Sequence, residues 1–235
     1  MNIEKVPISI LTPTYNRSKF LPLYIDNLIN LEYPHELLEI VIDDDGKEPF
    51  IKNLDEFKKT VFPMKVNYIR KQFKRTIGEK RNNLIKNAKS KIICFMDDDD
   101  IYHPCYIDYS YSAMKTEGAS CVGSNQMIFC YPFEDFKMTY IRCEKKFQIH
   151  EATMMMTKRY WKNNSGFSRS SRGEGAKIIG SNDKNVFVTD IRLIMICLAH
   201  QNNTVNKDMF NQDRNDLKQK YLGNKKDIIK YIFNI

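Results

Sequence analysis

Residues 92–104 read IICFMDDDDIYHP, an apolar run that ends in four consecutive aspartates, Asp97 to Asp100. Neighbouring carboxylates repel one another and raise each other's pKa unless water or a cation screens their charge. Successive side chains of an extended chain point to opposite faces, so Asp97 and Asp99 are expected on one side. The stretch therefore predicts an apolar strand followed by a D-x-D pair that faces a metal ion.

The first half of the chain alternates apolar, β-rich runs with segments of helical spacing. Strands alternating with helices are typical of a parallel sheet flanked by helices, so the expected fold class is α/β. The strands are predicted at Ile8–Thr12, Leu38–Asp43, Val66–Ile69 and Ile92–Met96, and helices are predicted over Phe20–Leu31 and Gly78–Ala88.

Polar motifs follow three of these strands. TPTYNR spans residues 12–17, DDDG spans residues 43–46, and the four aspartates follow the last strand. Ligands of open α/β sheets bind at the carboxyl ends of the strands. The three motifs are therefore expected to converge on one crevice.

The second half of the chain has a different pattern. A helix is predicted over Cys105–Met114, and a strongly apolar strand is predicted at Leu193–Ala199. From Asn206 onward the chain is polar, and an amphipathic piece, Lys225–Phe233, predicts a docked helix. The short runs between these elements resemble an antiparallel meander; they are Cys121–Val122, Gln126–Tyr131 and Met138–Arg142.

Composition describes an ordinary globular protein of 235 residues, with 42% hydrophobic and 28% charged residues. No apolar run approaches the ~18 residues that cross a bilayer, and the start lacks the layout of a signal peptide. We expect a soluble, cytoplasmic protein without a transmembrane segment. The cysteines are scattered, without a C-x-x-C pair, which favours buried thiols over disulfides or a zinc site.

The formal net charge of +8 favours an anionic partner, such as a nucleotide, an acidic glycan or a membrane surface. The lysines are spread along the chain, which fits a solvated surface equally well. Peripheral membrane contact through this basic surface is one expectation, and nucleic acid is not expected as a partner.

The motifs ISILTPTYNR, LEIVIDDDG and IGEKRNNLIKNAKSKIICFMDDDDIYHP resemble the nucleotide-binding half of family-2 glycosyltransferases of the GT-A fold. That family's usual pattern runs T-x-Y-N-R, V-D-D-G-S, A-R-N-x-G and F-x-D-x-D-D. Order, spacing and strand context agree over residues 6–104. The later YWKNNSGFSRSSRGEGAKII is similar, less closely, to the family's G-G-F followed by E-D, and the resemblance thins beyond about residue 200.

The resemblance implies a GT-A fold, with a mostly parallel sheet and a smaller antiparallel part on the acceptor side. It implies one catalytic domain over residues 1–205, with a nucleotide-binding half at 1–104 and an acceptor half at 105–205. Residues 206–235 are then a polar, helical tail. The implied activity is metal-dependent transfer of a sugar from a nucleoside diphosphate sugar, especially a UDP-sugar, to an acceptor hydroxyl with inversion. The acceptor is a glycan, lipid or protein.

The resemblance also implies which side chains contact the donor nucleotide. Tyr15 would stack on the base, Arg17 would approach phosphate, and Asp44 would accept the base's imide N–H. The competing interpretations are a surface turn, an Asx turn at D-D-G, and a solvated basic helix face. The implied nucleotide-binding residues are Thr12, Pro13, Tyr15, Arg17, Asp44, Lys80, Arg81, Asp97 and Asp98.

For the metal, Mn²⁺ or Mg²⁺, the resemblance implies Asp99 with Asp97 as ligands through hard oxygen atoms. Asp97 contacts either the metal or the ribose. Asp98 and Asp100 either support this site or cap the following helix. A late histidine is a further metal ligand in many GT-A enzymes, which makes His200 a candidate ligand or a hydrogen-bonded structural residue.

Glu174, in RGEGAKII, is the candidate general base that takes the acceptor proton. The family usually shows Glu-Asp at this point, with the Asp often assigned as base, whereas here Gly175 follows Glu174. Asp183 or Asp190 are the alternatives, and loss of the base is another. Trp161, with Tyr160, is expected either to form a platform for an acceptor sugar or to pack in the core.

Rival functions lack their motifs. The turn after the first strand is TPTYNR, where a dinucleotide oxidoreductase needs G-x-G-x-x-G, and no P-loop is present. A metal-dependent phosphatase is an enzymatic alternative, because it can also place D-x-D after a strand. A catalytically degenerate protein that binds nucleotide sugars or glycans is the second alternative.

Overall fold

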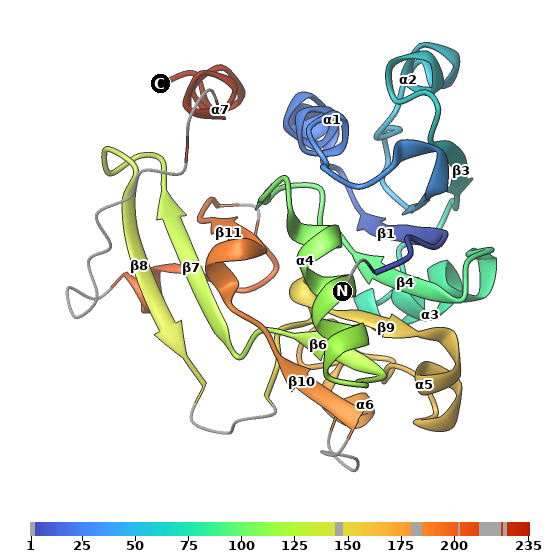
Figure 1. Ribbon diagram of the computed structural model, residues 1–235. Helices are drawn as coiled ribbons and strands as arrows, with labels where there is room; N and C mark the ends of the chain where they lie inside the picture. Colours follow the sequence, from blue (N-terminus) through green and yellow to red (C-terminus); the bar gives the residue numbers. More distant parts are fainter. Residues whose placement is uncertain (1–2, 144–147, 180–184, 202, 212–221, 223–224) are drawn as a thin grey trace.

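The computed structural model describes residues 3–143, 148–179, 185–201, 203–211, 222 and 225–235 (Figure 1). It contains a large sheet with the strand order β10-β6-β9-β4-β1-β2-β3 and a small sheet with the order β5-β11-β7-β8. Helices cover both faces of the large sheet, which confirms the predicted α/β class (Figure 1).

The four predicted strands form the parallel centre of the large sheet. They are β1 (Ile8–Thr14), β2 (Leu38–Asp44), β3 (Lys65–Arg70) and β4 (Ile92–Phe95). β1 lies between β2 and β4, and Thr14 is in register with Asp44. The carboxyl ends of these strands therefore lie along one edge of the sheet, where the polar motifs follow them.

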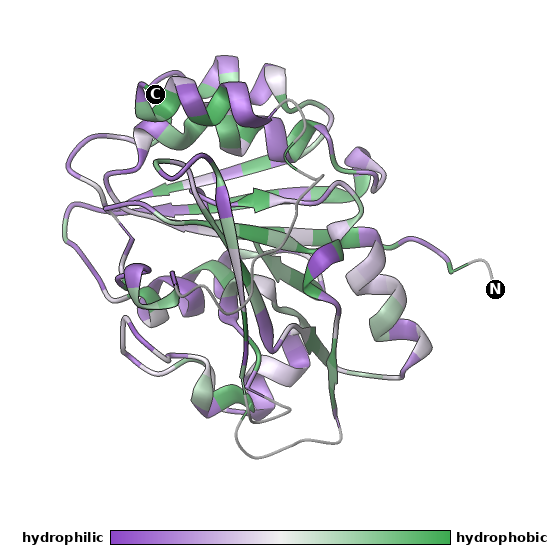
Figure 2. Cartoon of the chain, turned by 90° about the vertical axis from the view of Figure 1, so that its left-hand side faces the viewer, coloured by the Kyte–Doolittle hydropathy of each residue, from purple (hydrophilic) through white to green (hydrophobic). Residues whose placement is uncertain are grey.

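Alternating side chains of these strands bury two apolar layers. Ile10 and Ile40 pack in one layer, with helices α1 (Leu21–Ile29), α2 (Leu54–Thr60) and α4 (Tyr106–Thr116). Leu11 and Val41 pack in the other, with α3 (Ile77–Asn87), α5 (Lys158–Asn163) and α6 (Ala176–Ile179). Figure 2 shows the largely hydrophobic strands between helices that carry hydrophilic residues.

The remaining strands of the large sheet are short. β6 (Cys121–Gly123) and β9 (Met155–Thr157) pair antiparallel, as do β9 and β4. β10 (Val186–Val188) extends the sheet by pairing parallel to β6. Among the described strands, β3 and β10 therefore form the two edges of this sheet.

The small sheet corrects the predicted meander. Its strands are β5 (Ile101–Tyr102), β7 (Gln126–Tyr131), β8 (Lys137–Arg142) and β11 (Met195–Leu198). β7 and β8 pair antiparallel as expected, but β6 belongs to the large sheet and β11 runs parallel to β7. Ser124 and Asn125, both buried, connect β6 of the large sheet to β7 of the small sheet.

The last described helix, α7 (Lys225–Phe233), packs beside α1 (Figure 1). Lys225 Nζ lies 2.5 Å from Asp26 Oδ2, and the ring centroids of Phe233 and Phe20 are 5.8 Å apart. The predicted helix is therefore present and docked. The division of the chain at residue 205 stays a prediction.

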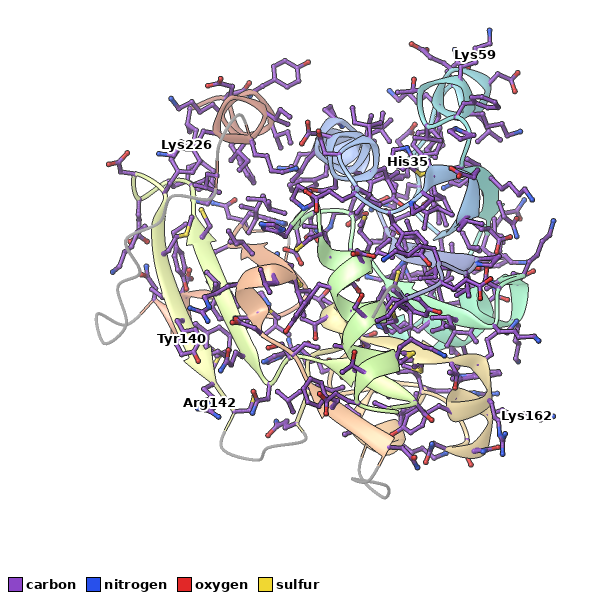
Figure 3. All side chains as sticks on the ribbon, in the orientation of Figure 1. His35, Lys59, Tyr140, Arg142, Lys162 and Lys226 are labelled. Atoms are coloured by element: carbon purple, nitrogen blue, oxygen red, sulfur yellow. The ribbon has the colours of Figure 1, made fainter. Side chains whose placement is uncertain are left out.

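Charged side chains are distributed around the molecule. Figure 3 shows Lys59, Arg142, Lys162 and Lys226 at separate corners of the view, and each is exposed. The expected membrane contact stays a prediction. Within the described ranges, the structure has no helix with the length and apolarity needed to cross a membrane.

Candidate active site

The loops after β1 and β2 are locked together. Asn16 has a left-handed backbone conformation, with φ of 53°, and its Oδ1 accepts a 2.7 Å hydrogen bond from the backbone N–H of Lys47. A Cβ at Gly46 would lie 2.7 Å from the backbone nitrogen of Asn16, so only glycine permits this approach. TPTYNR and DDDG therefore converge as predicted.

The four aspartates lie in the turn between β4 and β5, at the junction of the two sheets. Because the chain turns here, the alternation of an extended strand does not apply. Asp98 accepts a hydrogen bond from Thr14, and Asp100 accepts one of 3.0 Å from the backbone of Leu198. Asp98 and Asp100 thus hold neighbouring segments in place. This resembles the supporting role that was one of the two expected for them.

Asp99 meets His200, as the resemblance implies. Nε2 of His200 lies 2.9 Å from Oδ2 of Asp99, and the same carboxylate forms an ion pair with Arg17. Nδ2 of Asn203 is 3.4 Å from this oxygen, and the His200 ring packs 4.7 Å from that of Phe20. Arg17 and His200 therefore converge on one carboxylate from different ends of the chain.

Burial shifts the pKa values of several side chains in this cluster. It lowers the pKa of His200 to about 3, assisted by the nearby positive charge of Arg17. Burial also raises the pKa of Asp98 to about 6 and that of Asp100 to about 7. His200 is thus a neutral imidazole at neutral pH, the form that binds metals.

The donor atoms fit Mn²⁺ or Mg²⁺ by type: carboxylate oxygens from Asp97 and Asp99, and an imidazole nitrogen from His200. Oδ1 of Asp97 is buried and has no hydrogen-bond partner in the described part of the chain. Among the described residues, however, no group of three His, Cys, Asp or Glu side chains is placed to hold a metal ion unaided. Of these three side chains, Asp99 and His200 contact each other directly.

Two residues predicted to touch the nucleotide are engaged inside the protein. Thr12 is fully buried, and its hydroxyl donates a 2.8 Å hydrogen bond to the carbonyl of Met96. Asp44 is also fully buried and pairs with Arg70 at 2.7 Å. Its other partners are the backbone N–H groups of Gly46 and Phe50 and the hydroxyl of Tyr68.

This environment favours structural roles for Thr12 and Asp44. The 2.8 Å hydrogen bond from Gly46 to Asp44 Oδ1 is the Asx turn that D-D-G also predicted. Pro13, beside Asp43 in the β1–β2 register, is half-buried.

Tyr15 lies half-buried under a lysine. Nζ of Lys74 is 4.2 Å from the ring centroid of Tyr15, and Nζ of Lys80 is 5.9 Å from it. Lys80 is nearly fully buried, and its Nζ donates 2.8 Å hydrogen bonds to the carbonyl of Thr14 and to Asp45 Oδ1. Lys74 and the ion pair of Lys80 with Asp45 therefore lie beside this ring.

Arg81 is buried between two acidic groups. Its Nε donates a 3.0 Å hydrogen bond to Glu174, and one terminal nitrogen lies 3.6 Å from Asp97. Burial raises the pKa of Glu174, Arg81 opposes this shift, and the charge of Glu151 adds to it. The structure thus links the predicted base, the predicted phosphate-side arginine and the first aspartate of the metal motif.

The segment that carries Glu174 is docked on the start of α3. The backbone N–H of Gly78 donates a 2.8 Å hydrogen bond to the carbonyl of Ser170. A Cβ at Gly78 would lie 1.8 Å from the carbonyl oxygen of Ser168, so the approach requires glycine. Trp161 supports the same segment, because its indole N–H donates a 2.8 Å hydrogen bond to Asn82.

The alternative bases lie elsewhere. The carboxylate of Asp190 pairs with Arg192 at 2.5 Å, and its backbone N–H donates to the hydroxyl of Tyr109 on α4. Asp183 lies outside the described residues. Of the two candidates that the structure describes, Glu174 is the one linked to the metal motif, through Arg81.

Sequence reasoning missed several side chains of this site. Thr14 lies in TPTYNR, the motif that identified its neighbours, and Asn203 follows His200 by three residues, but neither matched a metal or phosphate pattern. Glu151 carried no local signal, because it lies in a short 3-10 helix, Glu151–Thr153, without a motif. Lys74 is one of many scattered lysines.

The strand order and the polar motifs at the carboxyl edge of the sheet agree with the GT-A fold of glycosyltransferases. The sequence model of glycosyl transferase family 2 matches residues 9–173, more than half of the chain. The chain belongs to this family. Membership leaves the phosphatase interpretation without support.

Two curated relatives match parts of the chain. The poly(ribitol-phosphate) beta-glucosyltransferase of Bacillus spizizenii is 33% identical over 99 residues, which cover 40% of this chain and 15% of that protein. The glycosyltransferase RP339 of Rickettsia prowazekii is 26% identical over 145 residues. This match covers 61% of the present chain and 42% of RP339. The match thus spans less than half of each relative.

Two solved structures share the fold. TarS of S. aureus in complex with UDP-GlcNAc superposes with a TM-score of 0.66 at 13% identity, covering 84% of this chain and 60% of that one. The mannosyltransferase PcManGT of Pyrobaculum calidifontis, in complex with GDP-Man and Mn²⁺, also has a TM-score of 0.66 and 13% identity, with coverages of 85% and 59%. At this identity the likeness shows the fold alone.

Proposed function

We propose that this protein transfers a sugar from a nucleoside diphosphate sugar, with UDP-sugars as preferred donors, to an acceptor hydroxyl in a metal-dependent, inverting reaction. The observation that carries the proposal is the convergence of Arg17, Asp99 and His200 at the carboxyl ends of β1 and β4. The UDP-GlcNAc in TarS and the GDP-Man with Mn²⁺ in PcManGT belong to those proteins, and they support the choice of donor class and metal.

Each side chain of the site has a task in this reaction. Arg17 would face the diphosphate and Tyr15 would offer its ring to the base, while Lys80 and Arg81 offset the negative charge of the neighbouring carboxylates. Asp99 and His200, with Asp97, would hold Mn²⁺ or Mg²⁺. When bound, the metal supplies positive charge that stabilises the leaving nucleoside diphosphate.

A carboxylate beside Arg81 accepts the proton of the acceptor hydroxyl while its oxygen attacks the anomeric carbon from the side opposite the diphosphate. The sequence assigns this task to Glu174. The acceptor is a glycan, lipid or protein hydroxyl, for which the half-buried Trp161 is a candidate contact.

A thermal-shift panel tests the donor site. UDP, UDP-GlcNAc, UDP-glucose and GDP-mannose are each added with Mn²⁺, Mg²⁺ or EDTA, since a ligand that binds only the folded state stabilises it by ~2.7 kcal/mol at a hundred times its Kd. We expect Mn²⁺-dependent shifts that are larger for UDP and a UDP-sugar than for GDP-mannose. If no nucleotide shifts the transition in any metal, the donor site is wrong.

One observation favours a second function. Glu174 is 4% exposed and hydrogen-bonded to Arg81, which ties up the residue assigned as base. A protein that binds nucleotide sugars without transferring them would show the same Mn²⁺-dependent shift but no release of UDP. Measuring UDP release in the same samples separates the two functions.

A further inference from the structure

The space beside Gly175 is filled by a carboxylate from another part of the chain. A Cβ at Gly175 would lie 2.7 Å from both Cγ and Oε1 of Glu151. Oε1 of Glu151 also accepts a 2.9 Å hydrogen bond from the backbone N–H of Gly175. Because position 175 has no side chain, the Glu151 carboxylate can lie against the backbone of the residue that follows Glu174.

Glu151 is tied to the metal motif through the backbone. The carbonyl of Ala152 accepts a 3.1 Å hydrogen bond from the hydroxyl of Tyr102. The same hydroxyl accepts a 2.9 Å hydrogen bond from the backbone N–H of Asp97. The 3-10 helix that carries Glu151 is thus fixed relative to the turn of the four aspartates.

The two glutamates differ in how much of their carboxylate is available. Glu174 is 4% exposed, and its Oε1 is held by the buried Arg81. Glu151 is only half-buried. In the described part of the chain, its carboxylate has one hydrogen-bond partner, the Gly175 N–H, on one of its two oxygens. A proton acceptor needs a free oxygen lone pair that a substrate hydroxyl can approach, and Glu151 offers one.

We propose that Glu151 is the general base, and that Glu174 positions Arg81. This inference rests on the proposed function and names a catalytic residue of the same site. The Glu151 carboxylate takes the proton of the acceptor hydroxyl as the new bond from oxygen to the anomeric carbon forms. The bond from that carbon to the diphosphate oxygen breaks, and the electron pair leaves with the nucleoside diphosphate. No other co-reactant is needed.

The first test compares Glu151→Gln with Glu174→Gln. UDP release from UDP-GlcNAc and UDP-glucose with Mn²⁺ is measured with water as the acceptor, because the same base activates water. The amide oxygen of Gln can still accept the Gly175 hydrogen bond, so the fold should persist. We expect Glu151→Gln to lower kcat by about 10²- to 10⁴-fold with unchanged UDP affinity, and its residual activity to lose the acidic limb of the pH profile.

The second test moves the carboxylate. Glu151→Ala vacates the space that a side chain at position 175 would occupy, so Glu151→Ala combined with Gly175→Asp returns a carboxylate to the same place. We expect this double variant to recover at least ten times the activity of Glu151→Ala. The matched control, Glu151→Ala with Gly175→Ala, fills the space without a carboxylate and should recover none.

The outcomes separate this inference from the proposed function. If the wild-type protein neither binds nor cleaves any donor of the panel, the proposed function fails. If it cleaves a donor and Glu151→Gln is equally active, or if the loss appears with Glu174→Gln alone, the assignment of Glu151 is overturned. Recovery by the alanine control as well as the aspartate variant would also overturn it, because packing would then explain the effect.

Discussion

At the scale of single residues, Asp99 is the acid around which the candidate site is arranged. Its carboxylate contacts Arg17 from the loop after β1 and His200 from the segment after β11. Arg17 and His200 lie 183 positions apart in the sequence, and the fold brings them together at the junction of the two sheets. A change in this one carboxylate should therefore affect the metal and the nucleotide together.

For Asp99→Asn we expect loss of Mn²⁺-dependent UDP binding in calorimetry, because an amide is a weak ligand for a hard cation and no longer balances Arg17. The matched control is Asp108→Asn on α4, where the carboxylate pairs with Lys5 at the surface. The control should bind UDP as the wild type does. An Asp99→Asn variant with wild-type affinity would contradict the site.

The lowered pKa of His150 predicts that the folded protein loses stability in mild acid. Burial, with a smaller effect of Lys207, lowers its pKa from 6.5 to about 4. The unfolded chain then binds more protons than the folded one below about pH 6.5, so stability is unaffected above that pH and falls as the pH drops towards 4. The upper limit of this loss is about 3 kcal/mol, at 1.36 kcal/mol for each pKa unit.

The measurement is urea unfolding of the wild type and of His150→Gln at pH 7 and at about pH 4.5. His200, whose pKa is also lowered, contributes equally in both proteins. The difference in unfolding free energy between the two pH values should be smaller in the variant. Equal differences would show that His150 gains its proton as easily in the folded protein as in the unfolded one.

The sequence predicted which residue types gather at the site better than it predicted what each one touches. Arg17, Asp99 and His200 come together as the resemblance implied. Asp44 shows the limit, because adjacent aspartates after a strand look alike in sequence. Its partners Tyr68 and Arg70 come from β3, and only the folded sheet shows that they surround this carboxylate.

At the scale of elements, α3 links the nucleotide side of the site to Glu174. Thr76 caps its start in a capping box with Glu79, and Lys80 and Arg81 follow within the first turns. The cap fixes where the helix begins and so sets the positions of both cations. A weaker cap should therefore be felt in binding as well as in stability.

Thr76→Ala is expected to lower the free energy of unfolding by about 1 kcal/mol and to weaken UDP binding. Asn53→Ala is the matched control, because Asn53 caps α2 in the same manner but no residue of the candidate site lies on that helix. Both variants should lose similar stability in denaturant titrations, and only Thr76→Ala should lose affinity. Equal affinities would separate the cap from the site.

Strands that carry an apolar run were predicted, including the three-residue β6, whereas β5 and β9 were not. β1, β2, β3 and β4 were all anticipated, because each carries a run of apolar residues. β5 has two residues and β9 has three, which is too short for any periodicity to show. Pairing with neighbours that are distant in sequence, such as β9 with β4, is what makes them strands.

At the scale of the whole molecule, α7 connects the far end of the chain to the metal motif. Lys225 donates a 2.9 Å hydrogen bond to Asn27, whose side-chain N–H donates 2.7 Å to the carbonyl of Asp100. The Phe233 ring lies 5.8 Å from that of His200. The helix therefore packs over the outer side of the candidate site.

Phe233→Ala should lower the free energy of unfolding by about 1 kcal/mol or more through its lost aromatic contacts, and should weaken Mn²⁺-dependent UDP binding by loosening His200. Tyr231→Ala is the control on the same helix, because Tyr231 is 75% exposed. Calorimetry and thermal unfolding of both variants check the expectation. Wild-type UDP affinity in Phe233→Ala would show that α7 acts on stability alone.

The chain contains one tryptophan, Trp161, and its place gives the protein an internal optical probe. The indole N–H is bound to Asn82 of α3, and the ring lies against Gly166 at the start of the segment that carries Glu174. A change in tryptophan emission, excited selectively over the 13 tyrosines, on adding a donor can therefore be assigned to this junction without labelling. The emission of the unmodified protein would follow, in real time, whether that segment moves.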